Sequence, residues 1–248
     1  MPSLPDAVVL CGGAGTRLRS VTGEAPKSMA SIAGRPFLEL LLRQLGRHGF
    51  ERAILAVGYQ KDVIQSYFGE QAMGLTLAYS VENSPLGTGG ALRNAAHLIH
   101  SGACLLLNGD SYTDADLSAF VAGHLEANAD VSLVVVPADG RSDCGNVLVD
   151  PSGKVTGFAE KEPVPGSAFY VNAGIYLIAR RLLEDIPAGV NVSLEREVFP
   201  RWLAAGKRIR ALLHRGVCID IGTPERYQAA QQILAAAETD SATPAGRR

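Results

Sequence analysis

A glycine-rich loop followed by two cations is the segment of this chain best suited to bind a charged ligand. Three glycines within four residues follow the apolar run 7–10, and they are Gly12, Gly13 and Gly15. Glycine permits positive φ angles and lets a phosphate approach bare backbone N–H groups. Thr16 and Arg17 come next, and the guanidinium of Arg17 presents a fixed fork of donors for phosphate oxygens. Because Pro26-Lys27 then adds a second cation, we expect this loop to hold a nucleoside triphosphate.

The spacing of these glycines excludes two common phosphate-binding motifs. A Walker A loop has the pattern Gly-x-x-x-x-Gly-Lys-Ser/Thr, which residues 12–17 do not supply. A dinucleotide-binding fingerprint has the pattern Gly-x-Gly-x-x-Gly, and the chain does not match that spacing either. The alternative without a ligand is a tight turn between a strand and a loop. Such a turn would not require Thr16, Arg17 or Lys27.

Two aspartates in strand-like surroundings are candidate ligands for a metal ion. Asp110 follows the apolar run 103–107, and Asp220 has an isoleucine on each side. An unpaired charge in an apolar strand is costly, so a shared cation would account for both acids. Mg²⁺ prefers one or two carboxylates together with phosphate oxygens. The alternative for Asp110 is to cap the following turn, although Asp114 or Asp116 could cap the next helix instead.

Strand-like and helix-like patterns alternate along the first half of the chain. Apolar runs predict strands at 7–10, 53–57, 75–79, 103–107 and 131–136. Amphipathic patterns predict helices at 37–48, 61–68, 89–99 and 114–128. This alternation predicts an α/β fold with a doubly wound, mostly parallel mixed sheet. Ligands of such sheets bind at the carboxyl ends of the strands, where the glycine loop and Asp110 both fall.

The second half of the chain predicts a small antiparallel lobe. Strands are expected at 146–149, 154–159, 169–178 and 208–213, with turns rich in Pro and Gly between the first three. Further helices are expected at 193–205 and from 224 to about 237. Because the sequence contains no repeat and no linker, we expect a single domain over residues 1–237. The tail 238–248 has the composition of a disordered segment.

Composition and charge narrow the function classes. Apolar residues make up 47% and charged residues 19% of the 248, as in ordinary globular proteins. A formal net charge of −2 gives no basic field for nucleic acid or an anionic membrane. We find no membrane-length apolar stretch and no signal peptide, and the four cysteines lack paired spacing, so we expect a cytoplasmic protein with free thiols. The histidines form no metal-binding pattern, so no zinc is expected.

Taken together, the motifs resemble those of the sugar-1-phosphate nucleotidyltransferases. The matching segments are the glycine loop, Pro26-Lys27, Pro85-Leu86-Gly87-Thr88, Gly109-Asp110, Glu160-Lys161, Asn172-x-Gly174 and Asp220-Ile221-Gly222-Thr223-Pro224. The resemblance extends from residue 7 to about residue 234 and implies the GT-A-like nucleotidyltransferase fold. In this family a nucleoside triphosphate gives its nucleotidyl group to a sugar 1-phosphate, and pyrophosphate leaves.

Within that family the chain is similar to short bacterial members that use GTP to activate D-glycero-α-D-manno-heptose 1-phosphate. These members also carry Ser-Met after Pro-Lys, as Ser28 and Met29 do here, and they serve capsule or lipopolysaccharide biosynthesis. Many relatives have an aromatic residue where this chain has Cys144, and a tryptophan where it has Cys218. Those departures concern the shape of the sugar pocket and remove no charged group. The resemblance also implies a nucleotide-binding half at about 1–137 and a sugar-binding half at about 138–237, and relatives are often homodimers.

The resemblance implies a role for each matching residue. Arg17 would hold the leaving β- and γ-phosphates, Lys27 the α-phosphate and Lys161 the sugar phosphate, while Asp110 and Asp220 would bind Mg²⁺. The implied nucleotide-binding residues are Leu10, Gly12, Gly13, Gly15, Thr16, Glu82, Pro85, Gly87, Thr88 and Gly109. The implied sugar-binding residues are Gly145, Glu160, Lys161, Asn172 and Gly174. Alternatively, Glu160 is a surface acid in a charged run and Asn172 is an amide satisfied within its strand.

The choice of nucleobase is argued from Glu82, because relatives place the segment 82–91 against the base. A carboxylate can accept from the adjacent N1–H and N2–H donors of guanine, whereas an amide suits uracil or thymine. This chemistry favours GTP unless Glu82 points to solvent. The competing functions are a mannose-1-phosphate guanylyltransferase and a uridylyl- or cytidylyltransferase acting on a hexose 1-phosphate. A non-catalytic nucleotide-sugar-binding regulatory protein is the alternative from another class, and the presence of Lys27, Asp110, Lys161 and Asp220 disfavours it.

Overall fold

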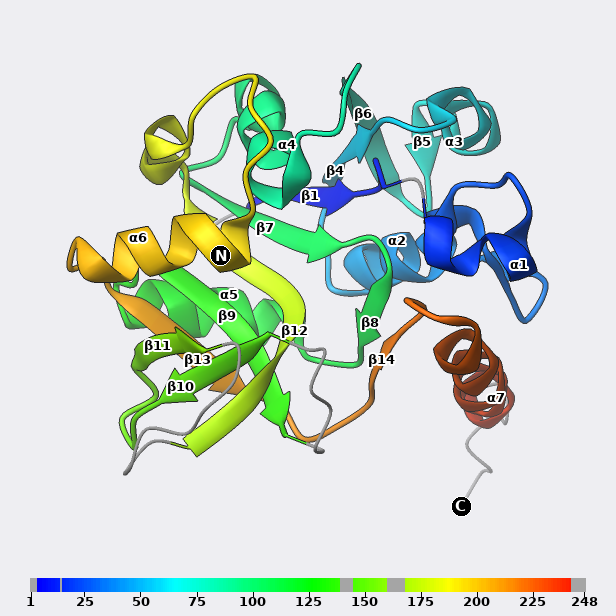
Figure 1. Ribbon diagram of the computed structural model, residues 1–248. Helices are drawn as coiled ribbons and strands as arrows, with labels where there is room; N and C mark the ends of the chain where they lie inside the picture. Colours follow the sequence, from blue (N-terminus) through cyan, green and yellow to red (C-terminus); the bar gives the residue numbers. More distant parts are fainter. Residues whose placement is uncertain (1–3, 14, 139–144, 160–167, 242–248) are drawn as a thin grey trace.

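A mixed ten-stranded sheet with a parallel centre organises the protein (Figure 1). The computed structural model describes residues 4–13, 15–138, 145–159 and 168–241. Four parallel strands lie side by side in the order β7, β1, β4, β6. Their bounds are β1 Asp6–Leu10, β4 Arg52–Val57, β6 Leu75–Val81 and β7 Ala103–Asn108. The α/β fold with a mostly parallel sheet, predicted from the alternation of patterns, is confirmed.

Two hydrophobic cores cover the two faces of this sheet, as a doubly wound fold requires. Successive side chains of a strand point to opposite faces, so Ala7 and Val9 enter one core while Val8 enters the other. The first core is closed mainly by α2 (Phe37–Arg47), α3 (Lys61–Phe68), α5 (Leu117–Glu126) and α7 (Pro224–Ser241). The second is closed mainly by α4 (Gly87–Ala95) and α6 (Phe199–Ala204). The apolar strands therefore read as continuous hydrophobic runs because both of their faces are buried.

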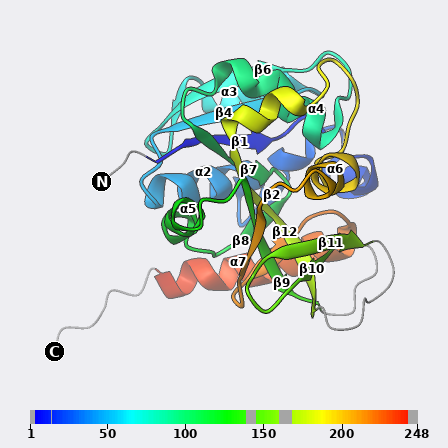
Figure 2. The same cartoon turned by 90° about the vertical axis from the view of Figure 1, so that its left-hand side faces the viewer.

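The second half of the chain extends the sheet with antiparallel strands. The long strand β12 (Ala168–Ala179) pairs with β7 through its second half and with β10 (Asn146–Val149) through its first half. The other edge of β12 pairs with β9 (Val131–Pro137), and β9 pairs in turn with β13 (Ile209–Leu213). Strand β11 (Val155–Ala159) pairs with β10. Figure 2 shows β9, β10 and β11 in the lower part of the view, apart from the parallel strands above.

Short elements complete the fold. The short strands are β2 (Ser31–Ile32), β3 (Arg35–Pro36), β5 (Gln71–Ala72), β8 (Ser111–Thr113) and β14 (Cys218–Asp220). The short helices are α1 (Arg19–Thr22), four 3-10 helices at Thr16–Leu18, Lys27–Met29, Ala96–Leu98 and Arg180–Asp185, and a π-helix at Leu194–Val198. Among the described ranges, none of the helices has the length and apolarity needed to cross a bilayer.

Several boundaries differ from the sequence-based expectation. The helix expected at 114–128 begins at Leu117, because the Asp116 carboxylate caps it by accepting a hydrogen bond from Ala119 N at 2.9 Å. The single helix expected at 193–205 is instead a π-helical turn followed by α6. The last helix, expected to end near 237, continues to Ser241. The alanines at 235–237 are strong helix formers, and the next proline is Pro244. The tail 242–248 lies outside the described residues.

Candidate active site

The glycine loop leaves the carboxyl end of β1 and packs directly against Lys27. Gly15 has φ of 57°, and a Cβ atom placed there would lie 2.7 Å from the Cβ of Lys27. Only glycine meets both requirements, so the loop and the lysine approach each other closely. Thr16 and Arg17 follow on an exposed 3-10 turn. The structure therefore places Lys27 beside the loop and leaves Arg17 exposed to solvent.

A cleft of about 600 Å³ opens at the carboxyl ends of the parallel strands. Eight of the ten predicted nucleotide-binding residues line it, and these are Leu10, Gly12, Gly13, Glu82, Pro85, Gly87, Thr88 and Gly109. Lys27 and Asp110 line it as well, whereas Gly15, Thr16 and Arg17 do not. The position of the cleft agrees with the rule that doubly wound sheets bind ligands at this edge.

The two aspartates come together through a short strand pair that the sequence did not reveal. Strand β14 pairs antiparallel with β8, which sets Asp220 opposite Ser111. The backbone N–H of Ile221 then donates to the carbonyl of Asp110 at 2.9 Å. Residues 110 and 220, far apart in the chain, are therefore neighbours across one strand pair at the edge of the cleft.

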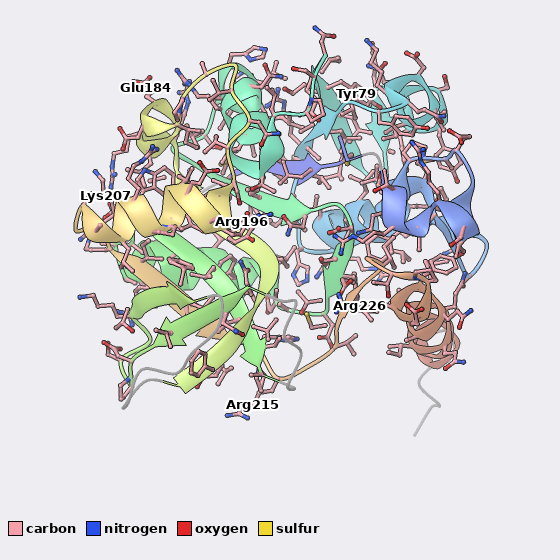
Figure 3. All side chains as sticks on the ribbon, in the orientation of Figure 1. Tyr79, Glu184, Arg196, Lys207, Arg215 and Arg226 are labelled. Atoms are coloured by element: carbon pink, nitrogen blue, oxygen red, sulfur yellow. The ribbon has the colours of Figure 1, made fainter. Side chains whose placement is uncertain are left out.

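Each carboxylate is held by a cation. Lys27 Nζ donates to Asp110 Oδ2 at 2.5 Å, and Ser111 Oγ donates to the other carboxylate oxygen at 3.2 Å. Arg226, labelled in Figure 3, extends from the first turn of α7 and donates to Asp220 Oδ1 at 3.1 Å. The Gly222 N–H reaches the same oxygen at 2.8 Å. Arg226 is a residue that sequence reasoning missed, since nothing in the pattern joins it to Asp220 before the helix position is known.

The pair of acids fits a hard divalent cation. Both carboxylates keep part of their surface exposed, 39% of the side chain for Asp110 and 23% for Asp220. The described residues contain no group of three or more His, Cys, Asp or Glu side chains able to hold a metal ion. Two partly exposed carboxylates match Mg²⁺, which commonly completes its shell with substrate phosphates and water.

Glu82 lies at the end of β6, against the glycine loop. A Cβ atom at Gly12 would lie 2.4 Å from its Oε1, and one at Gly58 would lie 2.7 Å from its Cγ. Its Oε2 accepts a weak hydrogen bond from Leu86 N at 3.4 Å. Burial raises the pKa of the Glu82 carboxyl, and the hydrogen bond from Leu86 opposes that shift only partly. The side chain is half-buried and lines the cleft, so it does not point wholly to solvent.

Two of the predicted sugar-side residues, Asn172 and Gly174, lie at an irregularity within β12. Asn172 Oδ1 accepts from Gly174 N at 3.0 Å, and Asn172 Nδ2 donates to Tyr176 Oη at 2.9 Å. Gly174 has φ of 75°, where a Cβ atom would lie 2.8 Å from Asn108 Nδ2. Gly145 accepts a hydrogen bond from Asn172 N at 3.0 Å. The Asn172 amide thus has partners within the fold, while Glu160, Lys161 and Cys144 lie outside the described residues.

A comparison with known families shows the family of the chain. The family described as nucleotidyl transferase matches residues 6–237, which include the glycine loop, Lys27 and both aspartates. The chain belongs to this family. The resemblance to sugar-1-phosphate nucleotidyltransferases, predicted from the motifs, is confirmed.

Two kinds of guanylyltransferase are similar to the chain. It is 40% identical to the mannose-1-phosphate guanylyltransferase of Mycobacterium tuberculosis, over 90% of this chain but 62% of that protein. It is 35% identical to the D-glycero-α-D-manno-heptose 1-phosphate guanylyltransferase of Campylobacter jejuni, over 89% of this chain and 96% of that protein. The chain thus spans less than two thirds of the mycobacterial protein and nearly all of the Campylobacter one.

A solved structure also resembles the fold closely. HddC from Yersinia pseudotuberculosis superimposes with a TM-score of 0.81 at 32% identity, covering 93% of this chain and 100% of that one. HddC has also been solved in complex with GMP-PN, and that structure superimposes with a TM-score of 0.80.

Proposed function

We propose that this protein transfers GMP from GTP to a sugar 1-phosphate, with D-glycero-α-D-manno-heptose 1-phosphate as the acceptor. The product, formed in the cytoplasm, would be a nucleotide-sugar used for surface polysaccharide synthesis. The observation that carries the proposal is the meeting of the glycine loop, Lys27 and the two aspartates at one edge of the sheet. The similarity to HddC, a structure of which contains GMP-PN, supports a guanine nucleotide.

The proposed reaction is a displacement at the α-phosphorus. An oxygen of the sugar phosphate forms a bond to that phosphorus while the bond to the β-phosphate oxygen breaks and pyrophosphate leaves. Such a transfer depends on positioning and electrostatics more than on a covalent protein nucleophile. Lys27 would follow the charge that develops on the α-phosphate. Arg17 would hold the leaving phosphates and Lys161 the incoming one.

Asp110 and Asp220 would hold the Mg²⁺ ion. When bound, that ion would neutralise phosphate charge and align the two substrates. In the structure the two acids are held by Lys27 and Arg226, so these cations keep the carboxylates oriented before substrate arrives. We further propose that Glu82 accepts the guanine N–H donors, and that Glu160, Asn172 and Gly174 face the sugar.

Pyrophosphate release tests the proposal. Purified protein with Mg²⁺ would be assayed with GTP, CTP, UTP, ATP and dTTP against heptose 1-phosphate and mannose 1-phosphate. We expect turnover with GTP and the heptose phosphate. Asp110→Asn should lower kcat at least about a hundredfold, because it removes one of two metal-binding carboxylates. The matched control is Glu126→Gln, an exposed acid at the end of α5, which should retain full activity.

A mannose-1-phosphate guanylyltransferase is the second candidate. The 40% identity to the mycobacterial protein favours it, although the chain spans only 62% of that protein. Turnover with GTP and mannose 1-phosphate alone would select this candidate. The absence of turnover with every pair would favour a regulatory nucleotide-sugar-binding protein instead.

A further inference from the structure

A π-helical turn holds an acid that the sequence analysis did not identify. In the π-helix Leu194–Val198, the carbonyl of Ser193 accepts hydrogen bonds from Glu197 N at 3.2 Å and Val198 N at 3.1 Å. Such single widened turns are rare and occur often at functional sites. Arg196, labelled near the centre of Figure 3, marks the position of the turn. Its neighbour Glu195 belongs to the same turn.

The carboxylate of Glu195 accepts hydrogen bonds from three hydroxyl groups. Thr88 Oγ1 and Ser193 Oγ donate to its Oε2 at 2.8 Å and 3.0 Å, and Tyr176 Oη donates to its Oε1 at 2.9 Å. Each hydroxyl has a single proton to donate, and an ionised carboxylate can only accept. The three donors therefore depend on this one acid, and hydrogen bonds to a charged group are stronger than neutral ones.

One arm of this network reaches the nucleotide side of the cleft. Thr88 lines the cleft at the start of α4, and its hydroxyl oxygen also accepts from Leu194 N at 2.8 Å. Close by, Gly89 N donates to Val192 O at 2.9 Å. The segment that carries Glu195 is thus fastened to the loop proposed to face the nucleobase.

The other arm reaches the sugar side. Tyr176 is fully buried, and its hydroxyl oxygen accepts from Asn172 Nδ2 at 2.9 Å. Asn172 in turn accepts from Gly174 N, at the point where the register between β12 and β9 shifts. Glu195 therefore fixes the side chain that orients Asn172, so the acid lies between two groups of residues that serve different substrates.

We infer that Glu195 is a positioning residue that sets the nucleotide-side Thr88 and the sugar-side pair Tyr176–Asn172 relative to each other. This inference rests on the proposed function, because it assigns the two arms to the two substrates. Replacing the carboxylate by an amide would put an N–H group where hydroxyls now donate. At least one arm would then lose its partner.

Steady-state kinetics of Glu195→Gln test this inference. The KM values for GTP and for the sugar 1-phosphate should both rise about tenfold, while kcat changes less than about threefold, because the variant leaves the phosphate- and metal-binding groups intact. Glu197→Gln is the control, since this exposed acid of the same turn accepts from Ser193 N at 2.9 Å and none of the three hydroxyl groups donates to it. It should leave both KM values within about twofold of the wild type.

A double-mutant cycle separates coupling from a general loss of structure. Thr88→Val and Tyr176→Phe should each raise KM by a smaller factor in the Glu195→Gln background than in the wild type. A lower Tm for Glu195→Gln with either KM unchanged would overturn the inference. Failure of the wild type to turn over any substrate pair would overturn the proposed function instead. In that case, calorimetric titration with GTP would still test the nucleotide arm of the inference. The inference requires Glu195→Gln to bind GTP more weakly than Glu197→Gln does.

Discussion

At the scale of single residues, the proposed role of Glu82 and the stability of the protein favour opposite protonation states of its carboxyl. Burial raises the pKa of its carboxyl, so the folded protein binds a proton there more readily than the unfolded chain does. Ionised Glu82 consequently lowers stability at neutral pH, and stability recovers as the pH falls through the raised pKa. The recognition of guanine that we propose for Glu82 has the opposite requirement, since only the ionised form can accept from both base donors.

Glu82→Gln should therefore raise the Tm slightly at pH 7 and lower the preference for GTP over UTP about tenfold. As the pH is lowered, the affinity of the wild type for GTP should begin to fall at a higher pH than it would if Glu82 had the pKa of an ordinary glutamate. Glu82→Gln should lack this pH dependence. Calorimetric titration with GTP and UTP at a series of pH values measures both effects. An unchanged nucleotide preference in the variant would remove Glu82 as the reader of guanine.

The site residues show how far the sequence reaches at this scale. Asp110 and Asp220 were predictable because acids in apolar strands need an explanation, and the structure brings them together. Their partner Arg226 was not predictable from spacing, and neither was Glu195, whose three hydroxyl donors come from distant segments. The roles assigned to all the site residues, including Arg17 and Lys161, stay predictions.

At the scale of elements, the last helix braces the segment that carries Lys27. Tyr227 Oη and Gln231 Nε2 both donate to the carbonyl of Ser31, at 2.5 Å and 2.6 Å, and Ala33 N donates to Gln231 Oε1 at 3.0 Å. These contacts join α7 to β2, which follows the Lys27 turn directly. The helix that supplies Arg226 to one aspartate thus also steadies the lysine that holds the other.

Gln231→Ala should cost about 1–2 kcal/mol of unfolding free energy and lower kcat several-fold, because two of these links to the Lys27 segment are lost. Denaturant unfolding and steady-state assays measure the two effects. Gln232→Ala, at an exposed position of the same helix, is the matched control and should change neither. Equal kcat values for the two variants would show that α7 does not position Lys27.

Regular elements were predictable where local patterns determine them. The central strands and α2 and α3 match the apolar runs and amphipathic periods, because both sheet faces are buried and each helix covers one of them. The π-turn was missed because it depends on backbone hydrogen bonds that a side-chain period does not encode. The β8–β14 pair was missed because three-residue strands joined across the chain leave no local signal.

At the scale of the whole molecule, the edge of the sheet opposite the cleft is held by two buried aspartates. Asp6 is the first residue of β1, and Asp130 directly precedes β9. The starts of these two strands lie in one row of paired residues across the sheet, and this row passes through Cys104 and Ile178. Asp6 accepts from His100 N at 2.6 Å and Arg52 Nη1 at 3.1 Å. Asp130 accepts from Arg208 N at 2.7 Å and from the Arg181 guanidinium.

Although burial alone would raise them, the pKa values of Asp6 and Asp130 are lowered, because these donors outweigh the desolvation. A carboxyl with a lowered folded-state pKa stabilises the protein fully above its unfolded value near 3.8, and that contribution is lost as the pH falls through the folded-state pKa. Glu82, at the cleft, has the opposite sign. The loss of stability in acid should therefore arise at this edge of the sheet and not at Glu82.

Asp6→Asn and Asp130→Asn should each lower the unfolding free energy by about 1–3 kcal/mol at pH 7, since each breaks hydrogen bonds to a buried charge. The difference from the wild type should shrink as the pH falls below about 4, where the wild-type carboxyls also become protonated. Urea unfolding at several pH values measures this, with the exposed Asp185→Asn as control. Both variants should keep the wild-type kcat at 25 °C. Residue 6 lies about 13 Å from the cleft end of β1, and Asp130 lies at the same edge of the sheet as Asp6. A stability difference that stays constant down to pH 3 would mean that these aspartates act through packing and not through charge.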